Sequence, residues 1–258
     1  MKKTAPKVKA KLSLSTPLLT VVLVILLSIT AFILSLKEKS SQKEDEISAV
    51  QLVLPADSIS LLQPDYRSAN SIEAVLKNRK TRLDFTESAL TLKQISQLLW
   101  AAQGINVDWG DRTAPSAKST YPLTVFLIAN NVDGLDAGEY QYIAGDRTPI
   151  HQLKPIKKVE MGDAIFKLLN QSSFNKIPAI LVVTGNMGKM AEAYGGIAHD
   201  KEVYLEAGYT AQNIALEAES LKLGTNVSTN FDELKLRELI TVSSSDTIIL
   251  LMPIGIPK

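Results

Sequence analysis

The stretch EVYLEAGYTAQNIALEAESLKL, from Glu202 to Leu223, predicts a long helix that ends at Gly224. Apolar residues recur along this helix, among them Leu205, Tyr209, Ile214, Leu216 and Leu221. Gly208 lies inside the predicted helix, where a glycine costs about 1 kcal/mol relative to an alanine. Two reasons can explain it: close packing against a neighbouring segment, or a backbone position that a ligand approaches.

Further helices and strands are predicted on both sides of this stretch. Capping boxes at Asn70 and Thr91 predict helices that run to about Arg79 and to Gly104. Two shorter helices are predicted over residues 160–170 and 232–240, and buried or short strands over residues 121–129, 139–143, 179–184, 225–228 and 247–252. Because helices and strands are interleaved without strict βαβ alternation, the pattern indicates an α+β layered domain.

The N-terminal part of the chain predicts a membrane anchor. Residues 12–36 carry no charge, a stretch long enough to cross the hydrocarbon core of a bilayer. Five lysines precede this stretch and acidic residues follow it, so the positive-inside bias favours a cytoplasmic N-terminus. The predicted parts are a basic cytoplasmic tail (1–16), a transmembrane helix (17–36), a polar linker (37–46) and an extracytoplasmic body (47–258). A cleaved signal peptide, which would leave a secreted body, is the alternative, although its apolar region usually spans only about 7–15 residues.

The composition excludes several classes of protein. With 45% hydrophobic and 21% charged residues, the 258-residue chain is too apolar to be disordered. The first 46 residues carry a net charge of +4 and the body −3, which argues against a nucleic-acid-binding surface. The absence of cysteine excludes disulfides, thiolate catalysis and thiolate metal sites. Only two histidines are present, so we expect no metal site.

The two histidines are not expected to act in catalysis. His199 stands beside Asp200, but adjacent residues rarely face each other, so a solvent-facing turn histidine is favoured. His151 closely follows Pro149 and is expected at the surface.

Four separated segments occur in a recognisable order. They read NRKTRLDF at 78–85, RTAPSA at 112–117, LEAG at 205–208 with AQN at 211–213, and MPIGIP at 252–257. Together they resemble the nitroreductase-like FMN flavoproteins, specifically their azoline-oxidase (SagB-type) branch, over about residues 70–257. The resemblance implies an α+β nitroreductase fold, with a central mixed or antiparallel sheet flanked by helices, here preceded by one transmembrane helix. It also implies a homodimer with two FMN sites at the interface.

The resemblance further implies which residues contact the FMN phosphate and ribityl chain. Arg79, Lys80 and Thr81 supply the cationic and hydroxyl donors that suit these groups. Leu83 stands where the family usually has a second basic residue, so Arg82 is expected to reach the N1–O2 edge of the ring.

Three more regions are implied in cofactor binding. A loop of small residues would let the backbone approach the ring, and its members are Pro115, Ser116, Ala117 and Ser119. Ala207 and Gly208 would place a backbone N–H near flavin N5 and O4. Lys258 would reach the phosphate, and Lys118 stands where the family often has glycine.

The function that the resemblance implies is that of an FMN-dependent oxidoreductase. Hydride would pass through flavin N5 in ping-pong fashion, and no side chain need be catalytic, because the cofactor carries the chemistry. The electron donor would be NAD(P)H or a quinol. Two alternatives stay open: an azoline-to-azole peptide oxidase that acts with a partner cyclodehydratase, and a degenerate membrane-tethered flavin- or ligand-binding module without turnover.

Overall fold

The computed structural model of the chain describes residues 28, 30–35, 57–107, 109–146, 148–168 and 177–258. The chain divides into two units, Met1–Val53 and Leu54–Lys258. In the first unit residues 28 and 30–35 are helical, and none of the helices that the structure describes is both long and apolar enough to cross a bilayer. The predicted transmembrane helix at 17–36 lies mostly outside the described residues and stays a prediction.

A seven-stranded sheet forms the centre of the second unit. In sheet order its strands are β1 (Ile59–Ser60), β6 (Pro149–Lys157), β5 (Gly138–Gly145), β3 (Leu123–Ala129), β7 (Ala179–Asn186), β9 (Asp246–Gly255) and β8 (Gly224–Thr225). All neighbouring strands in this sheet are antiparallel. A separate parallel pair joins β2 (Leu90–Thr91) to β4 (Val132–Asp133). The predicted α+β class is confirmed, with an antiparallel central sheet.

The helices begin close to where their capping residues predict. They are α2 (Ile72–Asn78), α3 (Leu92–Gln103), α4 (Gly162–Leu168), α5 (Met187–Ala193), α6 (Asp200–Ser220) and α7 (Glu233–Leu239), with a 3-10 turn η1 (Ala117–Ser119). Thr91 and Gln94 form the predicted capping box of α3: Thr91 Oγ1 accepts from the Gln94 N–H at 3.2 Å, and Gln94 Oε1 accepts from the Thr91 N–H at 2.9 Å. The cap of α2 is Ser71 instead of the predicted Asn70, because the Ser71 hydroxyl accepts from the Ala74 N–H.

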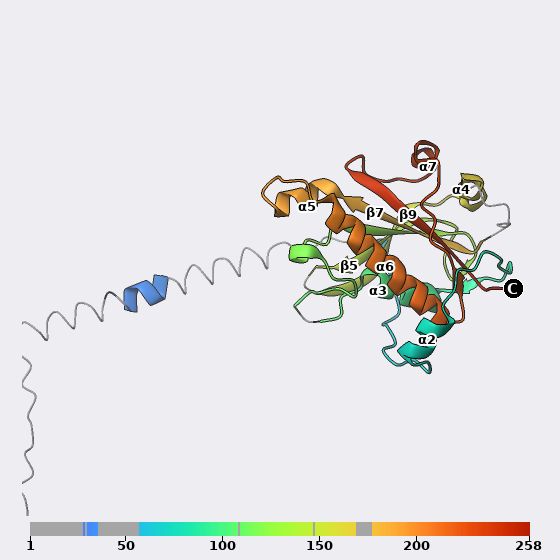
Figure 1. Cartoon of the computed structure of the whole chain (residues 1–258), viewed down its shortest axis with the longest axis horizontal. Coiled ribbons are helices and arrows are strands. Elements are labelled where there is room, and N and C mark those ends of the chain that lie inside the picture. The colour runs from blue at the N-terminus through green and yellow to red at the C-terminus, as the bar shows by residue number, and fades with distance from the viewer. Residues whose placement is uncertain (1–27, 29, 36–56, 108, 147, 169–176) are drawn as a thin grey trace, which may run out of the picture. The chain divides into compact units, whose positions relative to one another are not determined.

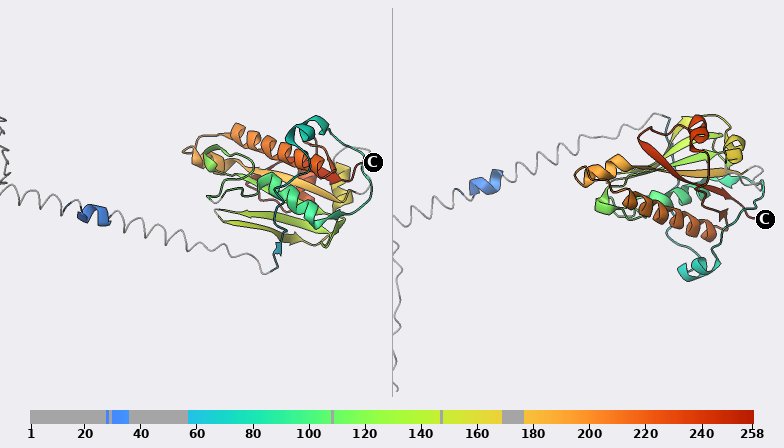
Figure 2. Two further views of the ribbon diagram at one scale, coloured as in Figure 1. Left: turned by 90° about the horizontal axis from the view of Figure 1, so that it is seen from below. Right: turned by 45° about the horizontal axis from the view of Figure 1, so that its top comes forward.

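Alternate residues of the central strands face two separate hydrophobic cores. On one face of the sheet, Val125 and Leu127 of β3 pack with side chains of α3 and α6. On the other face, Phe126 and Ile128 pack with side chains of α4 and α7. Figures 1 and 2 show α6 crossing the front of the sheet near β7 and β9, with α4 and α7 next to each other and away from α6. The result is a three-layer arrangement, with α3 and α6 on one face of the sheet and α4 and α7 on the other.

The C-terminal end of α6 comes earlier than predicted. Lys222 adopts the left-handed conformation (φ 58°), and its N–H donates to the Glu219 carbonyl. The Leu223 N–H donates to the Ala218 carbonyl at 2.7 Å, which completes a Schellman motif. Gly224, which the sequence predicts as the helix stop, lies instead in β8.

Strand β6 is not predicted from the sequence, and it places His151 in the interior. The ring is buried, so the predicted surface position is wrong: Nε2 lies 2.8 Å from Ser96 Oγ, and Nδ1 lies 2.8 Å from the Tyr142 hydroxyl. Ser96 donates its own proton to the Leu62 carbonyl at 2.6 Å, so the His151 Nε2–H must donate to Ser96 and Nδ1 must accept from Tyr142. Burial lowers the pKa of His151, in agreement with a neutral ring.

Candidate functional site

The first and fourth segments lie side by side near the C-terminal end of α6. The Arg82 N–H donates to the Thr225 carbonyl at 3.0 Å, and the Thr86 N–H donates to the Ile256 carbonyl at 2.8 Å. The chain therefore brings residues 82–86 against β8 and the end of β9, as the resemblance would require of a shared site.

The Phe85 ring holds this junction together. A Cβ atom on Gly224 would lie 2.8 Å from Phe85 Cε1, and a Cβ on Gly255 would lie 3.0 Å from Phe85 Cδ1. Both distances are too short for a normal contact, so glycine at these two positions makes the room that the ring occupies. Gly224 is thus needed for packing and not for ending α6.

The predicted phosphate contacts lie at the surface beside this junction. Arg79 is partly buried, while Lys80 and Thr81 are exposed. Neither Arg79 nor Lys80 forms an ion pair with a residue that the structure describes, so both charges can receive an anion. Lys258 Nζ lies 2.9 Å from Asp84 Oδ1. Because both side chains are exposed, this ion pair contributes little stability and can be exchanged for another contact.

Arg82 is directed toward α6. Its Nη2 lies 3.1 Å from Glu219 Oε2, and both side chains are mostly buried. Arg82 Nε and Thr225 Oγ1 are buried without a hydrogen-bond partner in the described part of the chain. An unused buried donor beside an unused hydroxyl fits a site that receives a further polar group, as the ribityl chain or ring edge of a flavin would provide.

The second segment packs on the middle of α6. The Asn213 side-chain amide donates to the Thr113 carbonyl at 3.1 Å, which joins the loop to the helix. A cavity of about 400 Å³ opens at this loop. It is lined by Asn106, Val107, Asp111, Arg112, Pro115, Ser116, Ser119 and Tyr121. Three of the four predicted loop residues therefore line a cavity, and Ala117 lies beside it in η1.

A buried polar network adjoins this cavity. Arg112 Nη1 donates to Gln103 Oε1 at 3.2 Å, and its guanidinium carbon lies 4.8 Å from the centre of the Tyr121 ring. Gln103 Nε2 donates to Thr210 Oγ1 at 2.8 Å and lies 3.4 Å from Glu206 Oε1. Burial lowers the pKa of Arg112 and raises the pKa of Glu206, because each is held away from water without a direct ion pair.

Lys118 does not enter the cavity. Its backbone is left-handed (φ 52°), the conformation that glycine adopts most easily. The side chain runs to the end of α5, where Nζ donates to the Ala193 carbonyl at 2.9 Å and lies 3.9 Å from the centre of the Tyr194 ring. The lysine thus fastens the loop to α5 and leaves the cavity mouth to smaller residues.

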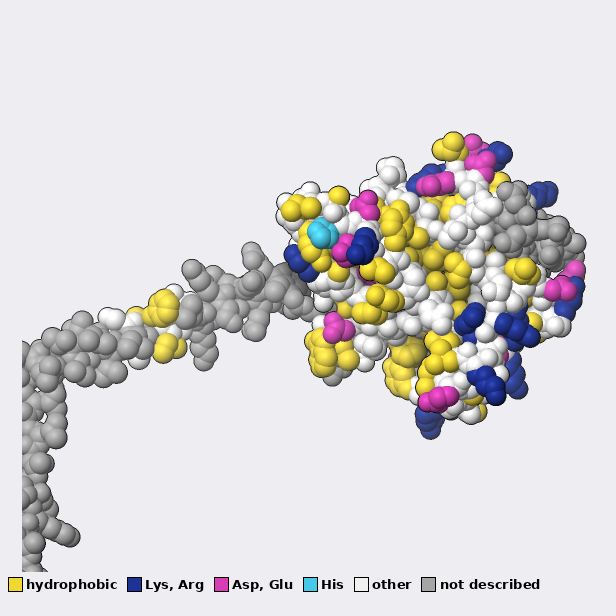
Figure 3. Space-filling model, in the orientation of Figure 1, with side chains coloured by type: hydrophobic (Ala, Val, Ile, Leu, Met, Phe, Trp, Pro, Cys, Tyr) yellow, Lys and Arg dark blue, Asp and Glu magenta, His cyan; other side chains and the backbone are white. Residues whose placement is uncertain are grey.

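The outward face of α6 is apolar and open. Tyr204, Leu205 and Tyr209 are about half exposed, at 51%, 47% and 45%, and Figure 3 shows apolar side chains across this side of the molecule. Apart from its two chain neighbours and the backbone of its own helix, no described atom lies within 4 Å of a Cβ built on Gly208. Close packing within the chain therefore does not explain this glycine. Ala207 faces the core and is 1% exposed.

The geometry separates the predicted site into two groups. Glu206 and Glu219 mark the two ends, and at 1.5 Å per residue they lie about 20 Å apart along α6. Gly208 lies well inside the helix, where a backbone N–H bonds to the carbonyl four residues earlier. The structure shows an open backbone surface at Gly208, and the contact of its N–H with a flavin stays a prediction.

Sequence reasoning missed the buried network around Arg112, Gln103 and Glu206. A charged residue inside an otherwise apolar helical stretch was the available signal at Glu206. It was not sufficient, because the direction in which Glu206 points depends on how α3 packs against α6.

The comparisons with known proteins agree with this geometry. The family model described as "Nitroreductase family" matches residues 76–256. A protein of Methanocaldococcus jannaschii whose name marks it as a nitroreductase is 32% identical over 200 residues, which are 77% of this chain and 97% of that protein.

Two solved structures are similar in fold. A crystal structure from Ralstonia eutropha, also named as a nitroreductase, is 28% identical, covers 78% of this chain and 90% of its own, and gives a TM-score of 0.66. A chain of the Escherichia coli microcin synthetase McbBCD complex is 21% identical, covers 76% of each chain and gives a TM-score of 0.57, which shows a likeness of fold alone.

Proposed function

We propose, because the chain belongs to the nitroreductase family, that it is an FMN-dependent oxidoreductase that works in ping-pong fashion. Members of this family bind FMN. The bound flavin would supply hydride chemistry at N5, which no side chain of this protein can supply. The observation that carries the proposal is the junction of residues 79–86 with β8 and β9, where unpaired cations stand beside unused buried polar atoms.

The residues at this junction would bind the phosphate end. Arg79 and Lys80 offer charge, and Thr81 offers a hydroxyl donor. Lys258 would exchange its exposed contact with Asp84 for the phosphate. Arg82, with a free Nε and a fixed Nη2, would donate to the ribityl chain or to the ring edge.

The residues at the other end of α6 would position the ring and the substrate. The cavity between Pro115, Ser116 and Ser119 offers small side chains and accessible backbone. Arg112, which also lines the cavity, is a partly buried cation that donates to Gln103, and a cation near a reduced flavin ring would stabilise its negative charge.

We also propose that two copies of the chain form a homodimer through the outward face of α6. Tyr204, Leu205 and Tyr209 would be covered by the same face of the second copy, as in an isologous interface. Such a dimer would cover the open face of α6 near the cavity of each protomer.

The electron donor would be NAD(P)H or a quinol. The sequence predicts that the body lies outside the cytoplasm, anchored by residues 17–36, and a membrane quinol would be the accessible donor there. The fold shared with a chain of the microcin synthetase complex keeps azoline oxidation in a peptide as the second candidate.

The test is the visible absorption spectrum of the purified full chain in detergent, before and after denaturation. We expect flavin bands, with FMN released on unfolding. Arg79→Ala should lower the flavin content several-fold, whereas Lys235→Ala on α7 should leave it unchanged, because Lys235 lies on the other face of the sheet and pairs only with exposed Asp232. A colourless chain that also takes up no added FMN would support the binding module without turnover.

A further inference from the structure

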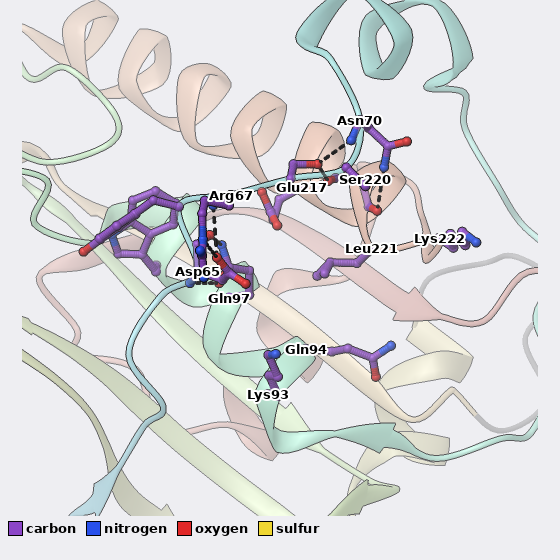
Figure 4. A pocket seen from close by; sticks show the side chains of 14 residues that line it. Asp65, Arg67, Asn70, Lys93, Gln94, Gln97, Glu217, Ser220, Leu221 and Lys222 are labelled. Atoms are coloured by element: carbon purple, nitrogen blue, oxygen red, sulfur yellow. Dashed lines mark hydrogen bonds and ion pairs between the residues drawn. The ribbon is translucent and has the colours of Figure 1, made fainter.

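A second and larger hollow lies away from the candidate flavin face. This groove of about 570 Å³ is bounded by α3, by the C-terminal end of α6 and by residues 65–70, which precede α2. Figure 4 shows Glu217 and Ser220 of α6 and the following Leu221 on one side of it, with Gln97, Lys93 and Gln94 below. Its volume lies within the range of small-molecule sites.

Part of the groove lies outside the segment that matches the family model. Its roof, residues 65–70, precedes residues 76–256, which match the family model. Its α6 residues face α3, whereas the proposed dimer face of α6 carries Leu205 and Gly208. The groove therefore requires an explanation of its own, independent of the proposed function.

The roof is fastened at both ends, so the groove is formed in advance. At one end the Asp65 N–H donates to Gln97 Oε1 at 2.9 Å, and Gln97 Nε2 donates to the Asp65 carbonyl at 3.1 Å. At the other end Asn70 Nδ2 donates to the Ser220 carbonyl at 3.2 Å, and Ser68 Oγ lies 3.0 Å from Ser220 Oγ. A site that needs no ordering loses less free energy when a ligand binds.

One wall of the groove is aromatic. The rings of Tyr66 and Trp100 pack edge to face, with centroids 5.3 Å apart. Trp100 uses its Nε1–H on the Ile105 carbonyl, so it presents an apolar surface. Such a wall favours an apolar side chain of a ligand.

The groove also holds charges that have no ion-pair partner. Arg67 pairs with Asp65 at 3.7 Å, but Glu217, Lys93 and Lys222 form no ion pair with any residue that the structure describes. Burial raises the pKa of Glu217, opposed by a hydrogen bond from Gln97, so the carboxylate would be stabilised by an incoming cation. The last turn of α6 contains no basic residue, and its carbonyl end adds to this preference for a positive group.

We propose that this groove binds a small peptide-like zwitterion with a free amino terminus. The ammonium group would pair with Glu217, the first side chain would lie on the wall formed by Trp100 and Tyr66, and the carboxylate would pair with Lys93 or Lys222. A dipeptide with an aromatic first residue carries all three of these groups, an ammonium group, an apolar side chain and a carboxylate, and so serves as the probe.

The experiment is a calorimetric titration of the full chain in detergent with three probes. The probes are phenylalanyl-glycine, its N-acetyl derivative and its C-terminal amide. Trp100 fluorescence, read in a Trp109→Phe background that leaves one tryptophan, reports whether the probe reaches this groove. We expect the free dipeptide to bind, and loss of either terminal charge to weaken binding about tenfold, the equivalent of about 1.4 kcal/mol.

Two variants assign the charges. Glu217→Gln should weaken binding of the free dipeptide about tenfold. Binding of the N-acetyl probe should not change further, because this probe already lacks the ammonium group that pairs with Glu217. The paired change Lys93→Gln with Lys222→Gln should act in the same way on the amide probe. Glu238→Gln, an exposed residue of α7, is the matched control.

Two outcomes would overturn the proposal. The first is the absence of heat and of any Trp100 signal with all three probes at concentrations up to about 10 mM, which corresponds to less than about 3 kcal/mol of binding. The second is equal binding of the three probes, since the unpaired charges would then play no part. Neither outcome depends on flavin, so failure here leaves the proposed oxidoreductase untouched.

Discussion

Glu219 of α6 receives the guanidinium of Arg82, with Nη2 and Oε2 3.1 Å apart and the two side chains 17% and 24% exposed. Arg82 also donates its backbone N–H to Thr225 in β8. One residue thus ties the segment with the proposed phosphate contacts to the long helix and to the sheet. A pair so withdrawn from water is sensitive to the loss of one partner, because the remaining charge stays behind uncompensated.

Glu219→Gln is therefore expected to lower the free energy of unfolding by about 1–3 kcal/mol, the cost of a charged hydrogen bond that is lost in a partly buried place. Urea unfolding followed by circular dichroism measures it. Glu238→Gln, which removes an exposed carboxylate, should change little. Equal effects of the two variants would mean that the Arg82 pair adds nothing to stability.

Gly224→Ala should destabilise the fold by about 1–3 kcal/mol, because its Cβ would lie 2.8 Å from the Phe85 ring and overpack the junction. Gly188→Ala in α5 is the matched control, since its Cβ would meet its nearest neighbour at 3.4 Å. Thermal melting of both variants gives the comparison. A Gly224→Ala protein as stable as the parent would show that Phe85 moves aside freely.

Gly208→Ala should have opposite effects on stability and on cofactor retention. Alanine stabilises a helix by about 1 kcal/mol relative to glycine, and its Cβ would meet no described atom within 4 Å beyond its own helix. The monomer without flavin should therefore have a higher melting temperature. If the open backbone serves a flavin or a second protomer, the same methyl group should lower flavin content and weaken dimerisation. Visible absorbance measures the flavin content and light scattering measures the dimer fraction of the same sample. If neither changes, Gly208 does not belong to the proposed site.

The buried His151 predicts a loss of stability in mild acid. Its pKa is lowered in the folded protein, so between about pH 6.5, the ordinary histidine value, and the lower folded value the unfolded chain binds more protons. Stability should fall as the pH decreases through this window and become flat for this group below it.

His151→Gln should remove that pH dependence, and His199→Gln should keep it. The buried carboxyls of Glu139, Glu206 and Glu217 have raised pKa values and give the opposite slope, stabilising the fold as the pH falls. The difference between parent and variant melting curves across the pH series isolates the histidine. If the stabilities of the parent and of His151→Gln depend on pH in the same way, the hydrogen bonds of His151 with Tyr142 and Ser96 tolerate a charged ring.

Much of the fold follows from local signals in the sequence. The capping box at Thr91 and the apolar spacing of residues 202–223 predicted α3 and α6, because these signals act within a few residues. Strand β6 was missed, because its residues alternate only partly and contain a histidine and two prolines. Its burial comes from the pairing with β5 and not from its own pattern.

The candidate site was predictable in its parts but not in its arrangement. Residues 79–82 and 115–119 are recognisable from their order along the chain. That Arg82 would turn toward Glu219, and that Glu206 would lie buried beside Gln103, depends on the packing of α6 against its neighbours. The groove under residues 65–70 has no motif at all, since it arises where three distant stretches meet.

Two roles of Lys222 favour different residues at this position, since its backbone conformation favours glycine and the proposed groove favours a cation. Lys222 ends α6 in a left-handed conformation, where glycine would be more favourable by about 1 kcal/mol, and it is one of the residues that line the groove. A lineage with no use for the groove would gain from glycine at this position, whereas a lineage that depends on it must keep a cation there. The residue found at position 222 among close relatives would thus record, across evolutionary time, whether the groove has been under selection.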